Sequence, residues 1–187
     1  MNSRSDKDIM FLVRDGQIDQ LSFLFDRHHV KLYNYFVLLT RDRALSQDLT
    51  QEVFMRILCF RSTFKGKGSF TSWMFQIARN VGIDHYRRHK NTNPLDDKIY
   101  ELESEEPTPY EESSQKQQIE ILHRALQKLS TKQREIIILA RFENLPMKKI
   151  AKILNCPVNT VKVRVHRAIK ELGAVYSKLT EVRHNAL

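Results

Sequence analysis

The most constraining feature of the sequence is a helical apolar pattern in residues 147–172 that one turn interrupts. The first part, MKKIAKIL, has an apolar side, and Asn-Cys-Pro then breaks the pattern. Pro157 suits the first position of a second helix, where its missing N–H costs nothing. The apolar residues that recur at helical spacing in that second helix are Val161, Val165, Ala168, Ile169 and Leu172. The pattern predicts two short helices joined by a tight turn.

The other side of the predicted second helix is polar and cationic. It carries Asn159, Lys162, Val163, His166, Arg167 and Lys170. The arrangement resembles a DNA-reading helix-turn-helix, whose second helix enters the major groove. Cationic groups on one face suit contacts to phosphates and base edges. An ordinary helical hairpin with a solvated basic face is the alternative that this stretch leaves open.

Composition favours an all-α protein with a polyanionic partner. Glycine and proline are sparse, with five of each in 187 residues, and helical patterns dominate the chain. The formal net charge of +9 favours nucleic acid before an acidic membrane surface. We expect two small helical domains joined by an acidic flexible linker. The expected divisions are residues 1–90, a linker at 91–115, a helix-turn-helix domain at 116–175 and a tail at 176–187.

The charge is laid out in three blocks. Residues 1–90 hold fifteen Lys/Arg against nine Asp/Glu, and residues 116–187 hold fifteen against five. Residues 91–115 hold one Lys against eight acids and three of the five prolines. This composition predicts a flexible or extended linker. Its acidity fits either a passive tether or a segment that mimics nucleic acid and covers a basic surface.

The sequence contains no recognisable catalytic or metal-binding motif. Cys59 and Cys156 are far apart, and no Cys/His cluster has zinc spacing. His28 and His29 lack a ligand partner one turn later, so we expect them to be packed or exposed. With no phosphate-binding loop, HExxH or nucleophile elbow, we expect no enzyme activity, catalytic residue, metal or cofactor. The N-terminus has no apolar signal segment and no run is long enough for a membrane span. We therefore expect a cytoplasmic protein without membrane insertion.

Periodicity predicts helices over residues 6–15, 18–40, 43–60 and 70–90 in the first basic block, with a glycine-rich, cationic loop at 61–69. The stripe expected to be buried in the second helix is Leu21, Phe25, His28, Leu32, Tyr35, Phe36 and Leu39. In the third helix, one face gathers Asp48, Gln51, Glu52 and Met55. An acidic face in a basic domain suits a basic or polar protein partner better than DNA. A simple solvated face is the alternative.

The last helix of the first block combines aromatic and cationic residues. Its apolar stripe is Phe70, Trp73, Met74, Ile77, Ala78 and Val81, and its other side carries Gln76, Arg79, Asn80, Ile83, Asp84, Arg87 and Arg88. Aromatic rings beside cationic and amide groups suit the capture of unpaired bases. Core packing of the rings is the competing explanation. In the second basic block, the patterns predict helices over 117–129 and 131–142, with Ser130 and Gln133 forming a capping box. The inward residues expected in the first of these helices are Ile119, Leu122, Ala125, Leu126 and Leu129.

Three motifs resemble bacterial sigma factors. DLTQEVFMRIL at residues 48–58 and FTSWMFQIARNVGIDHYRR at 70–88 are similar to sigma region 2. LSTKQREIIIL at 129–139, followed by IAKIL and TVKVRVHRA, is similar to region 4. Their order and spacing resemble the small extracytoplasmic-function (ECF) type. The resemblance implies a subunit of RNA polymerase that recognises a two-part promoter and opens its downstream part.

The resemblance also implies roles for particular residues. Asp48, Gln51, Glu52 and Met55 correspond to the face that docks on core RNA polymerase. The residues implied at the minus-ten element are Lys65, Lys67, Arg79, Asn80, Asp84, Arg87 and Arg88. At the minus-thirty-five element, the implied base readers are Lys162, Val163, His166 and Arg167. The implied phosphate contacts there are Asn159, Thr160, Arg164 and Lys170.

The family often has Ser where this chain has Val163, whose side chain prefers a thymine methyl to a hydrogen-bonding base edge. The expected partners are core RNA polymerase, promoter DNA and an anti-sigma protein. Two alternatives stay open at this point. One is a conventional helix-turn-helix regulator that acts without joining polymerase. The other is a helical interaction protein whose basic faces bind an acidic partner.

Overall fold

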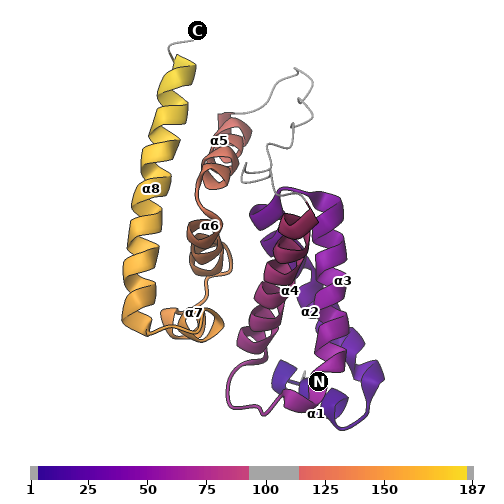
Figure 1. Cartoon of the computed structure of the whole chain (residues 1–187). Helices are drawn as coiled ribbons and strands as arrows, with labels where there is room; N and C mark the ends of the chain where they lie inside the picture. Colours follow the sequence, from indigo (N-terminus) through magenta and orange to yellow (C-terminus); the bar gives the residue numbers. More distant parts are fainter. Residues whose placement is uncertain (1–3, 93–113, 185–187) are drawn as a thin grey trace.

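A computed structural model describes residues 4–92 and 114–184, and within these ranges every regular element is helical. Figure 1 shows two groups of helices, α1–α4 and α5–α8, with the long helix α8 on the outer side of the second group. This confirms the expected all-α fold. Most of the expected linker, residues 93–113, lies outside the described residues.

The N-terminal unit is built from four helices and two short 3₁₀ turns: α1 (Asp6–Arg14), η1 (Ile18–Gln20), α2 (Leu21–Thr40), α3 (Arg43–Cys59), η2 (Arg61–Thr63) and α4 (Phe70–Thr92). Local chemistry sets several of the boundaries. The Asp42 side chain accepts a hydrogen bond from the Leu45 N–H at 2.9 Å and so caps α3. Arg41 adopts a left-handed φ of 61° and ends α2. The expected helices are confirmed to within a few residues.

The core of this unit follows most of the predicted stripes. On α2 the buried residues are Leu24, His28, Leu32, Tyr35 and Phe36. The prediction was wrong for Phe25, which is 39% exposed, while Leu24 is fully buried. Because both lie within one turn, the pattern of a helix with apolar residues on several sides did not resolve which one faces inward.

His28 is packed, as expected, and its Nε2 lies 2.7 Å from a carboxylate oxygen of Asp6. Arg27 donates a second hydrogen bond to the same carboxylate at 2.8 Å. These contacts tie α1 to α2.

The C-terminal unit consists of α5 (Ser114–Lys128), α6 (Thr131–Ile137), a π-helical segment η3 (Ile138–Phe142), α7 (Met147–Ile153) and α8 (Val158–His184). The capping box is confirmed, because the Ser130 and Gln133 side chains both bond to the other's backbone N–H. Two details differ from the prediction. The helix expected to end at Phe142 widens to π geometry from Ile138, and Ile119, expected inside, is 52% exposed. The last helix runs past Gly173 without a break to His184.

The two units pack against each other, and their buried apolar residues form one cluster. Arg134 of α6 lies at the junction with only 7% of its surface exposed. Its guanidinium donates to the carbonyls of Leu126, Gln127 and Leu129 at 3.0, 2.8 and 3.1 Å. It also donates to the carbonyl of Leu39, near the end of α2, at 2.6 Å. One buried cation therefore satisfies helix-end carbonyls in both units.

Candidate nucleic-acid interface

The helix-turn-helix is formed by α7, a short turn and α8. Asn155 takes a left-handed φ of 49°, and the Cys156 N–H donates to the Ala151 carbonyl at 3.0 Å. Pro157 stands one residue before the first residue of α8 instead of in its first position, and its carbonyl accepts the Val161 N–H at 3.1 Å. Proline is compatible with this place, because its own N–H is not needed at a helix start. The predicted motif is thus present, with its boundary shifted by one residue.

The two faces of α8 are separated as the sequence predicted. Val161, Val165 and Ala168 are buried, and they fix the helix against the rest of the unit. Thr160 is half-buried, and the exposed residues among the expected DNA contacts are Asn159, Lys162, Val163, Arg164, His166, Arg167 and Lys170. Val163 is 49% exposed, so one apolar side chain lies among the polar ones on the exposed face of α8. The spacing of these residues on a rigid helix is the geometry that major-groove recognition requires.

A second cationic surface is formed by the loop before α4 and by α4 itself. Lys65 and Lys67 are exposed in the loop, with Gly66 between them at φ +65°. On α4, Asn80, Arg87 and Arg88 are exposed. Arg88 Nε also donates to the Asp84 carbonyl at 3.4 Å, so the end of this surface is tied to its own helix.

The aromatic residues of α4 serve mainly the core. Phe70 and Phe75 are 2% and 0% exposed, and Trp73 is half-buried with its ring 5.2 Å from that of Phe64. Of the alternatives that the sequence left open, core packing holds for Phe70. The exposed ring on α4 is Tyr86, at 56%, which the sequence patterns did not single out.

Two of the expected minus-ten residues are engaged in ion pairs. Arg79 Nε lies 3.2 Å from a carboxylate oxygen of Glu135 in the C-terminal unit. Asp84 accepts a hydrogen bond at 2.6 Å from Arg56 of α3. These ion pairs tie α4 to the C-terminal unit and to α3.

The acidic face of α3 is present. Asp48 and Gln51 are exposed, Met55 is 59% exposed and Glu52 is half-buried. Arg56 donates to Glu52 at 2.8 Å as well as to Asp84, so one guanidinium bridges this face and α4. Sequence reasoning missed Arg56, although its i,i+4 spacing from Glu52 was a usable signal.

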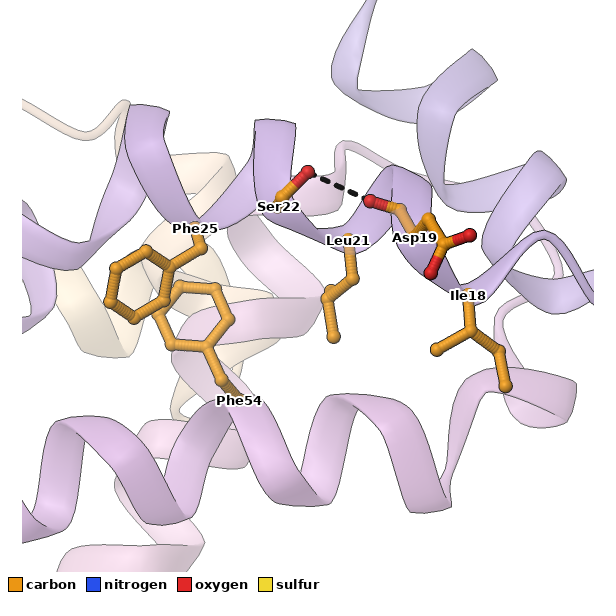
Figure 2. Close-up of a pocket in the computed structure, with 6 residues that line it drawn as sticks. All are labelled: Ile18, Asp19, Leu21, Ser22, Phe25 and Phe54. Atoms are coloured by element: carbon orange, nitrogen blue, oxygen red, sulfur yellow. Dashed lines mark hydrogen bonds between the residues drawn. The ribbon is translucent and has the colours of Figure 1, made fainter.

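An open apolar groove of about 510 Å³ borders this face. Figure 2 shows Phe25 of α2 against Phe54 of α3, with Leu21 and Ile18 continuing the same side and the Ser22 hydroxyl donating to the Asp19 carbonyl. The Phe25 and Phe54 ring centroids are 4.8 Å apart. Gln51 lies one helical turn before Phe54, so the groove and the acidic face are neighbours on α3. An exposed apolar groove beside carboxylates suits an amphipathic protein segment better than DNA.

Within residues 4–92 and 114–184, no three His, Cys, Asp or Glu side chains gather as metal ligands. In the same ranges, no helix is both long enough and apolar enough to cross a lipid bilayer.

Two family models match the chain, one in each helical unit. The model for sigma-70 region 2 matches residues 24–92, and that for sigma-70 region 4 matches residues 119–172. The RNA polymerase sigma factor SigV of Bacillus subtilis is 32% identical over 130 residues, which cover 70% of this chain and 74% of SigV. This chain belongs to the sigma factors of bacterial RNA polymerase.

Other relatives place it in the ECF group of sigma factors. The ECF RNA polymerase sigma factor SigX of Bacillus subtilis is 29% identical over 159 residues, 82% of each protein. CnrH, solved in complex with the cytosolic domain of CnrY, matches with a TM-score of 0.72 at 20% identity over 94% of this chain and 99% of CnrH. RpoE of Bartonella quintana, solved with the anti-sigma factor NepR, matches at 0.70 and 24% identity, over 83% and 96%. At these identities the solved structures establish the shared fold.

A sigma factor directs RNA polymerase to promoters and takes part in opening them, and sigma factors as a class are non-enzymatic initiation factors. Family membership also decides between the alternatives. The chain acts with polymerase and is not favoured as a free-standing helix-turn-helix regulator.

Proposed function

We propose that α8 reads the minus-thirty-five element as duplex, that the loop at 61–69 and α4 hold the opened minus-ten strand, and that α3 docks on core polymerase. The observation that carries the proposal is the exposed face of α8, where Lys162, His166 and Arg167 stand opposite the buried residues Val161, Val165 and Ala168. A helix anchored on one side and polar on the other is what a major-groove reader needs. Because polymerase works in the bacterial cytoplasm, we place the protein there.

At the minus-thirty-five element, the contacts divide by chemistry. Arg167 and Lys162 reach guanine O6 and N7, and Val163 packs on a thymine methyl. Asn159, Thr160 and Lys170 contact phosphates and fix the register of the helix without reading sequence.

At the minus-ten element, the protein must hold bases that have left the stack. Unstacking costs a few kcal/mol per base. Stacking on a side chain returns about 1–3 kcal/mol per base, and the cationic groups of α4 hold the backbone. Phe70 and Phe75 are buried, so we assign base stacking to Tyr86, which is 56% exposed, and to the half-buried Trp73.

The polymerase-docking assignment can be tested by charge removal. Asp48→Ala, alone and with Gln51→Ala, should weaken binding to core polymerase without affecting the fold, because both side chains are exposed. Asp26→Ala, which removes an exposed acid from α2, is the matched control. Equal affinities for all variants would remove α3 from the docking surface.

We also propose an anti-sigma partner that competes for the α3 face and its groove. Support comes from the solved neighbours, because RpoE was solved with an anti-sigma factor. A pull-down of the full-length chain from its native cells should recover such a protein in addition to polymerase. Recovery of polymerase alone would contradict this part of the proposal.

The decisive experiment for the function is reconstituted transcription. Core polymerase with this chain on a genomic library should yield chain-dependent start sites that share two sequence elements upstream. If no start site depends on the chain, the proposed function is wrong.

The roles on α8 can be separated by two variants. Arg167→Ala should cost about 1–3 kcal/mol of promoter binding and relax one base position, because a bidentate contact to guanine is lost. Lys170→Ala should weaken binding to all DNA sequences alike. It should also reduce the slope of log affinity against log salt concentration by about one. A uniform loss for Arg167→Ala would reassign that residue to phosphate.

A further inference from the structure

Helix α1 carries a cationic face to which the proposed function gives no role. Lys7, Phe11 and Arg14 recur at the spacing of one helix face, and Lys7 is exposed. Arg14 Cζ lies 4.6 Å and Lys7 Nζ lies 5.7 Å from the centroid of the Phe11 ring. The residues that anchor another side of α1 in the core are Ile9, Met10 and Val13. The cationic face is therefore held in a fixed direction.

This face of α1 lies against the tip of the loop at 61–69. A Cβ added to Gly66 would overlap the Phe11 ring and would lie 3.0 Å from Lys7 Cε, so the loop backbone packs on both side chains. Lys65 and Lys67, on either side of Gly66, are exposed. The surface that we call the tip patch consists of Lys7, Arg14, Lys65 and Lys67. Two segments far apart in the sequence thus supply one group of cations.

The acidic residues of α1 leave the charge of the tip patch largely intact. Asp6 is paired with side chains of α2. Asp8 lies about 100° around the helix from Lys7, and it accepts a hydrogen bond from the Ser5 hydroxyl at 2.6 Å. Asp15 pairs with Arg14 at 2.8 Å, but 59% of the Asp15 side chain is exposed. An ion pair in contact with water is weak, so a phosphate can replace Asp15 at this guanidinium.

Two ring contacts connect the tip patch with the proposed base-binding site. The Phe11 and Phe64 ring centroids are 5.6 Å apart, and those of Phe64 and Trp73 are 5.2 Å apart. Phe11 thus lies within about 11 Å of Trp73, which is roughly the length of three stacked nucleotides at 3.4 Å each. Trp73 is one of the rings to which we assign base stacking. A DNA strand held at Trp73 can therefore reach the tip patch within a few nucleotides.

The position of the tip patch on α4 indicates which part of the strand it meets. The C-terminal end of α4, at Thr92, leads along the chain to the helix-turn-helix unit, which we assign to the upstream element. The loop and the tip patch lie at the opposite end of α4, before Phe70. Under the proposed function, this end faces the downstream part of the opened strand, toward the transcription start.

We propose that the tip patch binds phosphates of the opened DNA strand downstream of the minus-ten element, and that Lys7 and Arg14 of α1 extend the DNA-binding surface beyond the loop. The proposal rests on the proposed function for the place of the strand. The match to sigma-70 region 2 begins at residue 24, so α1 lies outside it. A guanidinium stacked on an aromatic ring is pre-oriented for a phosphate.

An acidic protein surface is the competing partner for this cationic patch. DNA is favoured because Lys65 and Lys67, which belong to the same patch, are already assigned to the opened strand. A strand that passes these two lysines continues with one phosphate per nucleotide, and Lys7 adjoins the backbone between them. The phosphates next to those held by the loop are therefore the acceptors nearest to α1.

The test uses core polymerase with the full-length chain and two fork-shaped DNAs, taken from a promoter mapped by reconstituted transcription. In the short fork, the strand that carries the minus-ten element ends with that element. In the long fork, the same strand continues for several nucleotides toward the start site. The parent should bind the long fork several-fold more tightly. A long fork whose added linkages are uncharged methylphosphonates should lose this gain, because the patch binds charge.

The variant that tests α1 is Lys7→Gln combined with Arg14→Gln, which keeps the aliphatic stems on Phe11. It should lose most of the gain on the long fork and bind the short fork as the parent does. On the long fork, the slope of log affinity against log salt concentration should fall by roughly 0.7 for each lost phosphate contact. Lys7→Arg with Arg14→Lys keeps both charges and should keep most of the gain.

The matched control is Lys128→Gln combined with Lys132→Gln, which removes two exposed charges from the C-terminal unit and should behave as the parent. Thermal unfolding shows whether each variant is folded. A folded Lys7→Gln, Arg14→Gln variant with the full parental gain would overturn the proposal. So would weaker binding to core polymerase without DNA, which would make α1 a protein-docking surface.

The two forks also separate this proposal from the proposed function. A parent that binds the short fork and gains nothing from the longer strand refutes the role of the tip patch alone. A parent that directs polymerase to neither fork refutes the proposed function, and the role of the tip patch is refuted with it.

Discussion

Arg134 is the single side chain whose loss should harm the fold most. Its guanidinium serves four backbone carbonyls in two units, and burial lowers its pKa to about 10, so it stays charged at neutral pH. Arg134→Met should destabilise the chain by about 3 kcal/mol, because buried carbonyls lose their donors. Arg134→Lys should recover part of this loss. Denaturant unfolding measures both, and a change within the roughly 0.5 kcal/mol typical of surface sites would contradict the role.

Asp6 ties α1 to α2 in a manner that depends on pH. Partial burial acts to raise its pKa, but hydrogen bonds from Arg27 and His28 outweigh it and hold the pKa of Asp6 below its ordinary 3.8. The unfolded chain then takes up the proton first as pH falls, so the stabilisation is present above pH 3.8 and is lost below it.

Asp6→Asn should therefore be less stable than the parent at neutral pH, and the two should converge as pH falls below 3.8. Thermal unfolding across this range measures the difference, with the exposed Asp26→Asn as control. A gap that persists in acid would mean that Asp6 acts through packing and not through its charge.

The sequence predicted correctly which side chains are buried where the periodicity of a single helix determines this. The buried stripe and exposed face of α8 follow from 3.6-residue periodicity, and the structure agrees with it at Val161, Val165 and Ala168. The Tyr35–Glu135 contact and the Arg134–Leu39 contact could not be assigned in this way, because the partners are about a hundred residues apart in the sequence. Nothing local marks a polar residue as belonging to a contact between units.

At the scale of elements, the conformation of the loop at 61–69 depends on its packing against α1. Gly66 has φ +65°, and a Cβ added there would overlap the Phe11 ring, which also packs on Phe64 with centroids 5.6 Å apart. Gly66→Ala should destabilise the unit by about 1–3 kcal/mol and displace the cationic loop tip, because a strained backbone and an overlap are both introduced.

Gly68→Ala provides the matched control for this loop. A Cβ at Gly68 would meet only Lys152 Nζ, at an ordinary 3.9 Å. Its unfolding temperature and its rate of promoter opening should stay close to those of the parent, while Gly66→Ala lowers both. Equal unfolding temperatures and opening rates for the two variants would show that the loop conformation does not depend on packing against α1.

Element boundaries were predicted well where capping chemistry is explicit, as at Ser130 and Gln133. The π segment Ile138–Phe142 was not predicted, because its sequence is an ordinary helical one and the widened turn packs against α2. Tertiary contact overrides local preference at such a place.

For the whole molecule, the stability of the two packed units should depend on pH through Glu135, which contacts Tyr35 and Arg79 of the N-terminal unit. Burial raises the pKa of Glu135 above its ordinary 4.5, although Arg79 and the Tyr35 hydroxyl act to lower it. Folding therefore takes up protons at Glu135, and its contribution to stability should fall as pH rises from 4.5 toward neutrality. Denaturant unfolding across this range measures the change.

The matched variant for this prediction is Glu135→Gln, which cannot titrate and should show a flatter pH response. Burial raises the pKa of Glu143 in the same direction, whereas burial and Arg41 lower that of His123, which opposes the trend. Both groups are shared by parent and variant, so their difference isolates Glu135. Parallel pH profiles would exclude Glu135 as the titrating group.

Arg56 joins the acidic face of α3 to α4 through two ion pairs. Its guanidinium is divided between Glu52, at 2.8 Å, and Asp84, at 2.6 Å. Under the proposed roles, a polymerase that binds Glu52 leaves Arg56 paired with Asp84 alone, and a DNA strand that binds Asp84 leaves Arg56 paired with Glu52 alone. Polymerase docking and strand opening would then be coupled energetically through one guanidinium.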